Sequence, residues 1–278
     1  MKRIGPYEVI RELGHGAFGR VYLARNTESS DPVAIKIAHH ANDRRVLAEG
    51  RSLIQLNHPG IVSMLEVGSD GDLHYLVSEY TTGPNLETAL QSPSFDWIQS
   101  VRIVIAVAEA LSHAHAHRVI RRDIKPANII LVEPDRPVLV DFDLAVDETS
   151  GAENLKGDFA GTLAYMSPEQ VIGEGHRLDG RTDIYSLGVV LYRMLTGRLP
   201  FHCDDAAELK RQIREDDPQP PRQLVPNLPM DLDSICVQTL SKDYPDRQTT
   251  AGDLATQLRG LLGTVRWPGF RGPRESLN

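Results

Sequence analysis

The chain has 278 residues, with 30 Lys and Arg against 38 Asp and Glu, so its formal net charge is −8. This acidity argues against a nucleic-acid-binding protein, which normally presents a basic face. The hydrophobic share of 41% is ordinary for a globular protein. The two cysteines, Cys203 and Cys236, form no C-x-x-C pair, so a reducing, cytoplasmic setting is favoured over a disulfide framework. Neither a signal peptide nor an apolar run of about eighteen residues is evident, and we expect no membrane segment within this chain.

A glycine-rich segment lies between two predicted strands near the N-terminus. Residues 7–13 and 20–25 have strand-like alternation, and G-H-G-A-F-G occupies residues 14–19. The pattern G-x-G-x-x-G also occurs in dinucleotide-binding folds, but there a helix follows the glycines. Because a second strand follows here, we predict a β-hairpin whose tip lets backbone N–H groups approach phosphates. The alternative is a flexible turn that binds nothing.

The rest of the first third predicts a small β-rich unit. The run V-A-I-K at residues 33–36 predicts a third strand, and residues 42–56 have an apolar stripe at helical spacing. Residues 61–67 and 73–79 predict two more strands, joined by a polar turn. We therefore expect five strands and one helix.

A strongly apolar helix is predicted over residues 97–116, and three histidines lie at its end. His113, His115 and His117 suggest a metal site, but residues at i and i+2 do not share a helix face. Only His113 and His117 share one. We therefore favour a structural role, in which this helix end packs under the following loop.

The segment of residues 119–143 concentrates groups that carry chemistry. Two β-prone runs, residues 129–132 and 138–140, flank a proline-containing turn and predict a hairpin. A hairpin brings its ends together, so Asp123, Lys125 and Asn128 should converge with Asp141. Carboxylate and amide oxygens suit Mg²⁺, which usually takes only one or two protein carboxylates. A further carboxylate can then accept a proton.

The motif R-R-D-I-K-P-A-N followed by D-F-D resembles the catalytic loop and metal motif of protein kinases. The resemblance runs from about residue 7 to 262 and is greatest to bacterial-type serine/threonine protein kinases. It implies an α+β, two-lobed fold, with a small lobe over about residues 7–80 and a mostly helical lobe over 81–263. Residues 264–278 are expected to form a tail or linker.

The resemblance also implies ATP and Mg²⁺ as cofactors and assigns site residues. Asp123 would accept the proton of a substrate hydroxyl, Lys125 would stabilise the transferred phosphoryl group, and Thr162 would bond both. Asn128 and Asp141 would hold the metal. The residues implied to bind ATP are Leu13, Gly14, Gly16, Gly19, Val21, Ala34, Lys36, Glu49, Glu79, Thr81 and Ile130. Among these, Glu49 would pair with Lys36, residues 79–83 would form the hinge, and Ser78 would be the gatekeeper.

Two residues depart from the family pattern. Arg121 replaces the usual histidine; its stem could cover Phe142 while its head finds a carboxylate such as Asp183. Asp143 replaces the glycine of D-F-G. These departures are the only support for a pseudokinase, an ATP-binding scaffold without turnover. A small-molecule kinase is a third alternative, against which the peptide-docking resemblance of G-T-L-A-Y-M-S-P-E argues.

The remaining expectations concern regulation and architecture. Phosphate on Thr149 or Ser150 could pair with Arg122 and order the activation segment, residues 141–169. Asp183 would bond the catalytic loop, and Thr182 or Asp183 could cap the helix that begins there. Arg247 would pair with Glu169. Further helices are expected around residues 208–214, 232–240 and 254–262. Partners would be proteins with Ser or Thr acceptors, and self-association would serve autophosphorylation.

Overall fold

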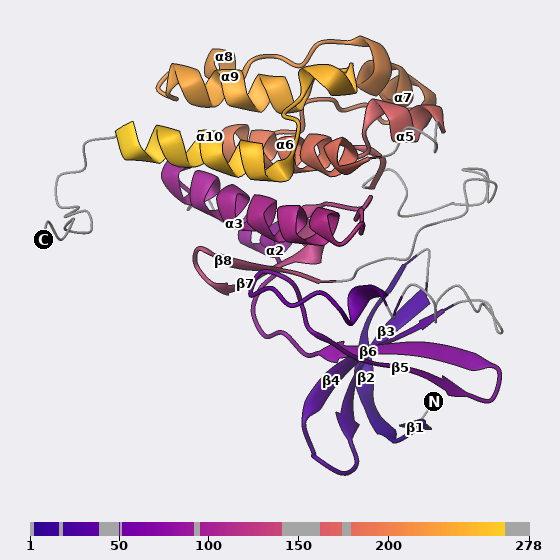
Figure 1. The fold of residues 1–278 in the computed structure, drawn as a ribbon. Helices are drawn as coiled ribbons and strands as arrows, with labels where there is room; N and C mark the ends of the chain where they lie inside the picture. The colour runs from indigo at the N-terminus through magenta and orange to yellow at the C-terminus, as the bar shows by residue number, and fades with distance from the viewer. Residues whose placement is uncertain are drawn as a thin grey trace, which may run out of the picture.

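The computed structural model describes residues 3–16, 19–38, 50, 52–91, 95–140, 162–173 and 179–264. An N-terminal sheet lies against a larger, mostly helical part (Figure 1). The sheet has six antiparallel strands in the order β1-β2-β3-β4-β6-β5. The strands are β1 Arg3–Ile4, β2 Tyr7–Gly16, β3 Gly19–Asn26, β4 Pro32–Ala38, β5 Met64–Asp70 and β6 Leu73–Glu79.

The prediction of five strands was one short, because β1 has two residues and carries no periodic pattern of its own. The strand predicted from residue 61 begins at Met64 instead. Ile61 and Val62 are buried in the large core, and the Val62 N–H donates to the Leu139 carbonyl at 2.9 Å. Their apolar side chains thus join the lobes rather than extend the sheet. The helix predicted over residues 42–56 lies mostly outside the described residues.

The two faces of the sheet have different surroundings. A small core on one face includes Val33, Ile35 and Ile37 of β4. Because side chains alternate along a strand, Ala34 and Lys36 lie on the opposite face. Both residues are half-buried there.

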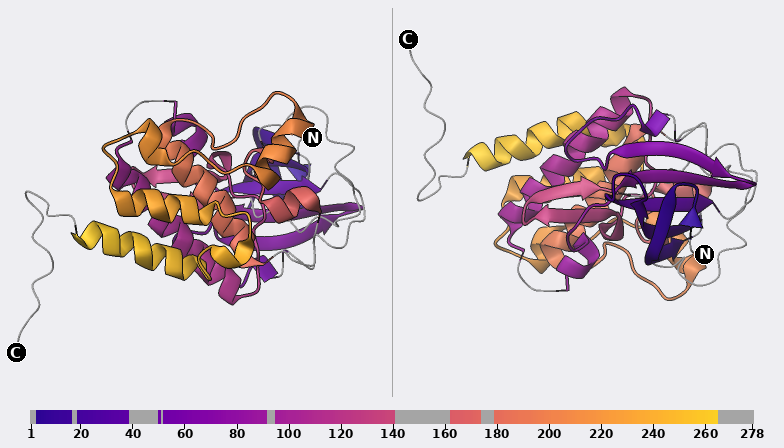
Figure 2. Two further views of the ribbon diagram at one scale, coloured as in Figure 1. Left: turned by 90° about the horizontal axis from the view of Figure 1, so that it is seen from above. Right: turned by 90° about the horizontal axis from the view of Figure 1, so that it is seen from below.

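The helical lobe is built around two long helices. Helix α3 (Trp97–Ala116) buries half of its residues and helix α6 (Gly180–Thr196) most of its residues. Helix α10 (Ala251–Thr264) packs alongside α3 (Figure 2). The other elements are α2 Leu86–Ala89, η1 Pro126–Asn128, β7 Ile129–Glu133, β8 Arg136–Leu139, α5 Pro168–Ile172, α7 Ala206–Glu215, α8 Pro221–Leu224, α9 Met230–Thr239 and η3 Tyr244–Asp246. Within the described part of the chain, none of the helices combines the length and the apolarity that a membrane span requires.

The predicted cap of α6 was wrong. The helix begins at Gly180, and its N-cap is Asp179, whose side chain accepts from the Arg181 N–H at 2.8 Å. Thr182 and Asp183 lie inside the first turn and bond elsewhere: Thr182 to Glu169, and Asp183 to the catalytic loop. Both side chains are therefore committed to tertiary contacts.

Candidate active site

The predicted hairpin of β7 and β8 is present and brings the catalytic loop beside the residues that follow β8. Ile129 pairs with Leu139, and the Val140 N–H donates to the Asn128 carbonyl at 3.0 Å. Asn128 is therefore adjacent to the chain that continues into Asp141. Asp141 itself, like Phe142 and Asp143, lies outside the described residues.

Four of the predicted catalytic residues meet in one cluster. Lys125 Nζ lies 2.9 Å from Asp123 Oδ2 and donates to Thr162 Oγ1 at 3.2 Å. Asn128 Nδ2 donates to the same Asp123 oxygen at 2.8 Å and to the Asp123 carbonyl at 3.1 Å. The contacts with Lys125 and Asn128 both use Oδ2, and none of the described residues bonds Asp123 Oδ1. Asp123, Lys125, Asn128 and Thr162 therefore lie together. Of the two bonds expected of Thr162, the one with Lys125 is present, and the described residues show none with Asp123.

The backbone of the catalytic loop is held by Asp183, whose side chain is fully buried. Its carboxylate accepts from the backbone N–H groups of Arg121 (2.9 Å) and Arg122 (2.7 Å), and His115 Nε2 lies 2.7 Å away. The Arg121 guanidinium donates to the Val140 carbonyl. Arg121 thus links the catalytic loop to the chain leading into Asp141.

The other histidines at the end of α3 also have structural surroundings. His113 packs between His58 and His117, with ring centroids 5.3 Å and 4.5 Å apart. His117 Nδ1 lies 2.9 Å from the His113 carbonyl, and burial lowers the pKa of His58. Together with the contact of His115, these packings place the end of α3 beneath the catalytic loop, as the structural interpretation predicted.

The nucleotide side of the predicted site is a row across the sheet. Gly14 pairs with Val21 and Val21 with Lys36, and directly paired residues share a face. Gly16 pairs with Gly19, so the glycines do close a β-hairpin as predicted. Its tip, residues 17 and 18, lies outside the described residues.

The predicted adenine-binding residues lie on or next to β2, β4, β6 and β7. Ala34 pairs with Ser78 on the same face, and Ile130 is half-buried on β7. The Glu79 N–H donates to Ser63, whereas no described residue bonds the backbone N–H of Thr81. Leu13 lies in β2 next to Gly14. Glu49, the predicted partner of Lys36, lies outside the described residues.

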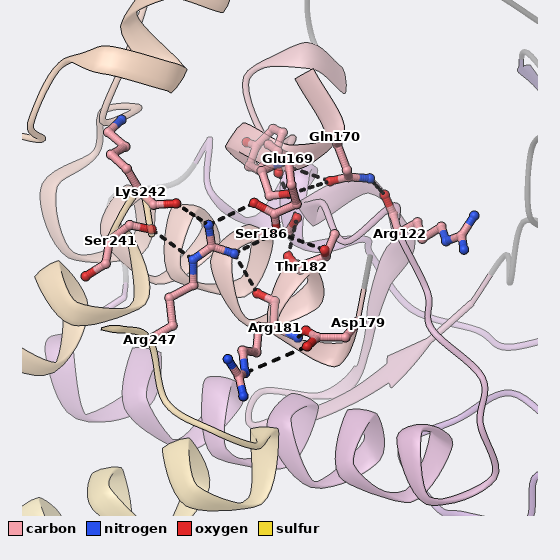
Figure 3. Close-up of polar contacts among 12 residues, drawn as sticks. Arg122, Glu169, Gln170, Asp179, Arg181, Thr182, Ser186, Ser241, Lys242 and Arg247 are labelled. Atoms are coloured by element: carbon pink, nitrogen blue, oxygen red, sulfur yellow. Dashed lines mark hydrogen bonds and ion pairs between the residues drawn. The ribbon is translucent and has the colours of Figure 1, made fainter. Parts of the chain in front are cut away.

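The predicted pair of Arg247 and Glu169 is present and buried (Figure 3). The guanidinium donates to both carboxylate oxygens, at 2.7 Å and 2.9 Å, and Thr182 Oγ1 donates to Glu169 Oε1 at 2.9 Å. Burial alone would raise the pKa of Glu169, but the hydrogen bonds and charge of Arg247 outweigh burial and the pKa is lowered. Glu169 therefore remains ionised and ties α5 to the chain before α10.

Sequence reasoning missed Gln170, which bonds the catalytic loop directly. Its side chain also completes a capping box with Ser167 at the start of α5. The spacing S-x-x-Q is a recognisable signal for that cap. It does not reveal the second contact, with Arg122, because that residue is 48 positions away.

Comparison with known proteins identifies the class. The family described as "Protein kinase domain" matches residues 7–258. The chain belongs to this family, and its β-rich and helical lobes form the two-lobed kinase fold.

Several bacterial proteins are similar over nearly the whole chain. A protein named probable serine/threonine-protein kinase PknB from Bifidobacterium longum is 35% identical over 91% of the chain. Serine/threonine-protein kinase PrkC from Bacillus subtilis is 32% identical over 95%, and serine/threonine-protein kinase pkn3 from Myxococcus xanthus is 35% identical over 92%. The chain spans 39%, 42% and 50% of the length of these relatives, respectively.

Proposed function

We propose that this chain transfers the γ-phosphoryl group of Mg-ATP to serine or threonine hydroxyls of proteins. The observation that carries the proposal is the cluster of Asp123, Lys125, Asn128 and Thr162. Phosphoryl transfer needs mainly positioning and charge neutralisation. Asp123 Oδ1 takes the acceptor hydroxyl's proton, and Lys125 offers its ammonium to the negative charge of the transferred group. Thr162 holds Lys125 in place.

ATP and a divalent metal follow from the family, and the described donor atoms fit them. Asn128 donates to Asp123 through its amide nitrogen, so its side-chain oxygen remains as a ligand of the type that Mg²⁺ prefers. The metal, held by Asn128 and Asp141, would neutralise phosphate charge. Lys36 and the backbone around Gly14 would hold the phosphates, and the hinge N–H of Thr81 would bond the adenine. The other residues proposed to bind ATP are Leu13, Gly16, Gly19, Val21, Ala34, Glu49, Glu79 and Ile130.

The pseudokinase alternative has little support. One of the two departures that suggested it, Arg121, makes contacts on both sides. Its backbone N–H donates to Asp183, and its guanidinium donates to the Val140 carbonyl. Every residue expected to carry charge in the chemistry is present in the sequence. The relatives are named kinases.

The proposal includes a switch by phosphorylation of the activation segment. Arg122 directly precedes Asp123, and its side chain points away from the buried pair of Arg247 and Glu169 (Figure 3). No described residue pairs with its guanidinium. A phosphate on Thr149 or Ser150, both outside the described residues, would supply that partner. Replacing both with alanine should lower activity, and unchanged activity would refute the switch.

Partners and setting are part of the same proposal. The acceptors would be protein serines and threonines, and self-association would bring one copy's activation segment to another's active site. Cys203 and Cys236 are both free thiols, which supports a reducing, cytoplasmic environment. The domain would end near residue 263, with residues 264–278 as tail or linker.

The test is incubation of the purified chain with Mg²⁺ and labelled ATP, with Asp123→Asn as the control. Wild type should label itself or a protein acceptor, and the variant should lose about 10²- to 10⁴-fold in rate while still binding ATP. ATP binding without label on either protein would favour a scaffold. Label on a metabolite acceptor alone would favour a small-molecule kinase.

A further inference from the structure

Gln170 lies in α5, outside the catalytic loop, yet it contacts the loop next to the proposed base. Its side-chain Nε2 donates to the Arg122 carbonyl at 2.8 Å (Figure 3). That carbonyl belongs to the peptide bond between Arg122 and Asp123. A movement of this peptide plane therefore moves the backbone nitrogen of Asp123.

The Arg122 backbone has an unusual conformation that needs such support. Its φ is 62°, in the left-handed region that residues with a Cβ rarely adopt. Strained residues of this kind persist only where the surroundings hold them in place. Asp183 Oδ1 accepts from the Arg122 N–H at 2.7 Å on one side, and Gln170 donates to the carbonyl on the other. The strained residue is thus fastened at both ends.

We infer that Gln170 is a positioning residue for phosphoryl transfer, acting on Asp123 through the Arg122 carbonyl. This inference rests on the proposed kinase activity. It also explains how α5 is tied to the base: Glu169, its neighbour, anchors the helix to Arg247 in the large lobe. Gln170 transmits that anchorage to the catalytic loop.

A purely structural role for Gln170 is the competing explanation. Its Oε1 accepts from the Ser167 N–H at 3.0 Å and from Ser167 Oγ at 3.2 Å, which stabilises the start of α5. The two roles use different atoms of one amide. Gln170→Glu keeps the accepting oxygen and replaces the donating nitrogen with a second acceptor, so it separates them. A glutamate at this position of a capping box is fully compatible with the cap.

The experiment compares wild type with Gln170→Glu, Gln170→Ala and Asp253→Ala. Asp253 is the matched control because it closes a similar cap with Thr250 at the start of α10. Gln170→Glu should lower kcat roughly threefold to tenfold, as expected for one lost hydrogen bond, with KM for ATP unchanged and the melting temperature near that of wild type. Asp253→Ala should lower the melting temperature but leave kcat unchanged.

A second measurement does not need turnover. Hydrogen–deuterium exchange of the amides in residues 119–125 should speed up in Gln170→Glu and Gln170→Ala, but not in Asp253→Ala. If the wild-type protein transfers no phosphate but exchange is still faster in the two Gln170 variants, the kinase proposal is overturned and the Gln170–Arg122 link stands. Unchanged exchange, or wild-type kcat in Gln170→Glu, would overturn the positioning role.

Discussion

Arg247→Met should strongly destabilise this protein, and the contacts of Arg247 explain why. The guanidinium is fully buried and makes five hydrogen bonds: two to Glu169 and one each to the carbonyls of Arg181, Ser241 and Lys242. Methionine fills similar volume but leaves the Glu169 carboxylate, whose side chain is 6% exposed, without its cation. Breaking a buried pair in this way costs about 3–5 kcal/mol.

Urea and thermal unfolding would measure the effect. For a domain of this size the loss corresponds to a fall in melting temperature of about 6–20 °C. Arg214→Met is the matched control, because Arg214 pairs with Glu215 at the surface, where such pairs contribute about 0–1 kcal/mol. If Arg247→Met cost no more than Arg214→Met, our account of the buried pair would be wrong.

A double variant and a pH series test whether the unpaired charge of Glu169 causes this loss of stability. Replacing both partners, as in Glu169→Leu with Arg247→Met, removes the orphaned charge and should be less destabilising than Arg247→Met alone. The deficit of Arg247→Met should also depend on pH. In wild type the pKa of Glu169 is lowered, so its stabilisation is present above the unfolded pKa and lost as pH falls through the folded one. Without Arg247, burial raises that pKa, and the difference between the proteins should shrink as pH falls from 7 to about 5.

Other predictions concern packing and catalysis. Gly188→Ala should lower the free energy of unfolding by about 1–3 kcal/mol, because a Cβ at this position of α6 would collide with the Thr239 side chain. Gly260→Ala, with open space around it in α10, should raise it by about 0.5–1 kcal/mol. Urea unfolding of both variants checks this contrast. Lys125→Met should lower kcat by about 10²- to 10³-fold and leave ATP affinity unchanged, because it removes the positive charge that Thr162 holds beside Asp123. Steady-state kinetics and ATP titration measure both quantities, and a near-normal kcat would contradict the role given to Lys125.

Local patterns accounted for much of the fold and for the centre of the site. The hairpin of β7 and β8, the glycine hairpin of β2 and β3, and helices α3 and α10 were predictable, because turn residues and apolar periodicity act over a few neighbouring positions. Asp123, Lys125 and Asn128 lie within six residues, so the loop itself brings them together. The family resemblance supplied their roles.

Contacts between residues far apart in the sequence were harder to predict. The sequence predicted that Arg247 and Glu169 pair, but it did not reveal the three carbonyls that complete the guanidinium's contacts. The cap of α6 was misplaced because Thr182 has an attractive capping hydroxyl, and only the fold shows that Glu169 takes it. Strand β1 had too few residues to produce a pattern.

The sequence by itself therefore determined which chemical groups the chain carries and where its helices and hairpins form. The tertiary structure decided which atoms meet. Asp183, expected by resemblance to bond the catalytic loop, accepts from the N–H groups of Arg121 and Arg122, and Gln170 donates to the Arg122 carbonyl. The physical reason is that a hydrogen bond depends on atoms within about 3 Å of each other. Over separations of 48 to 78 residues, packing of the whole chain sets that distance.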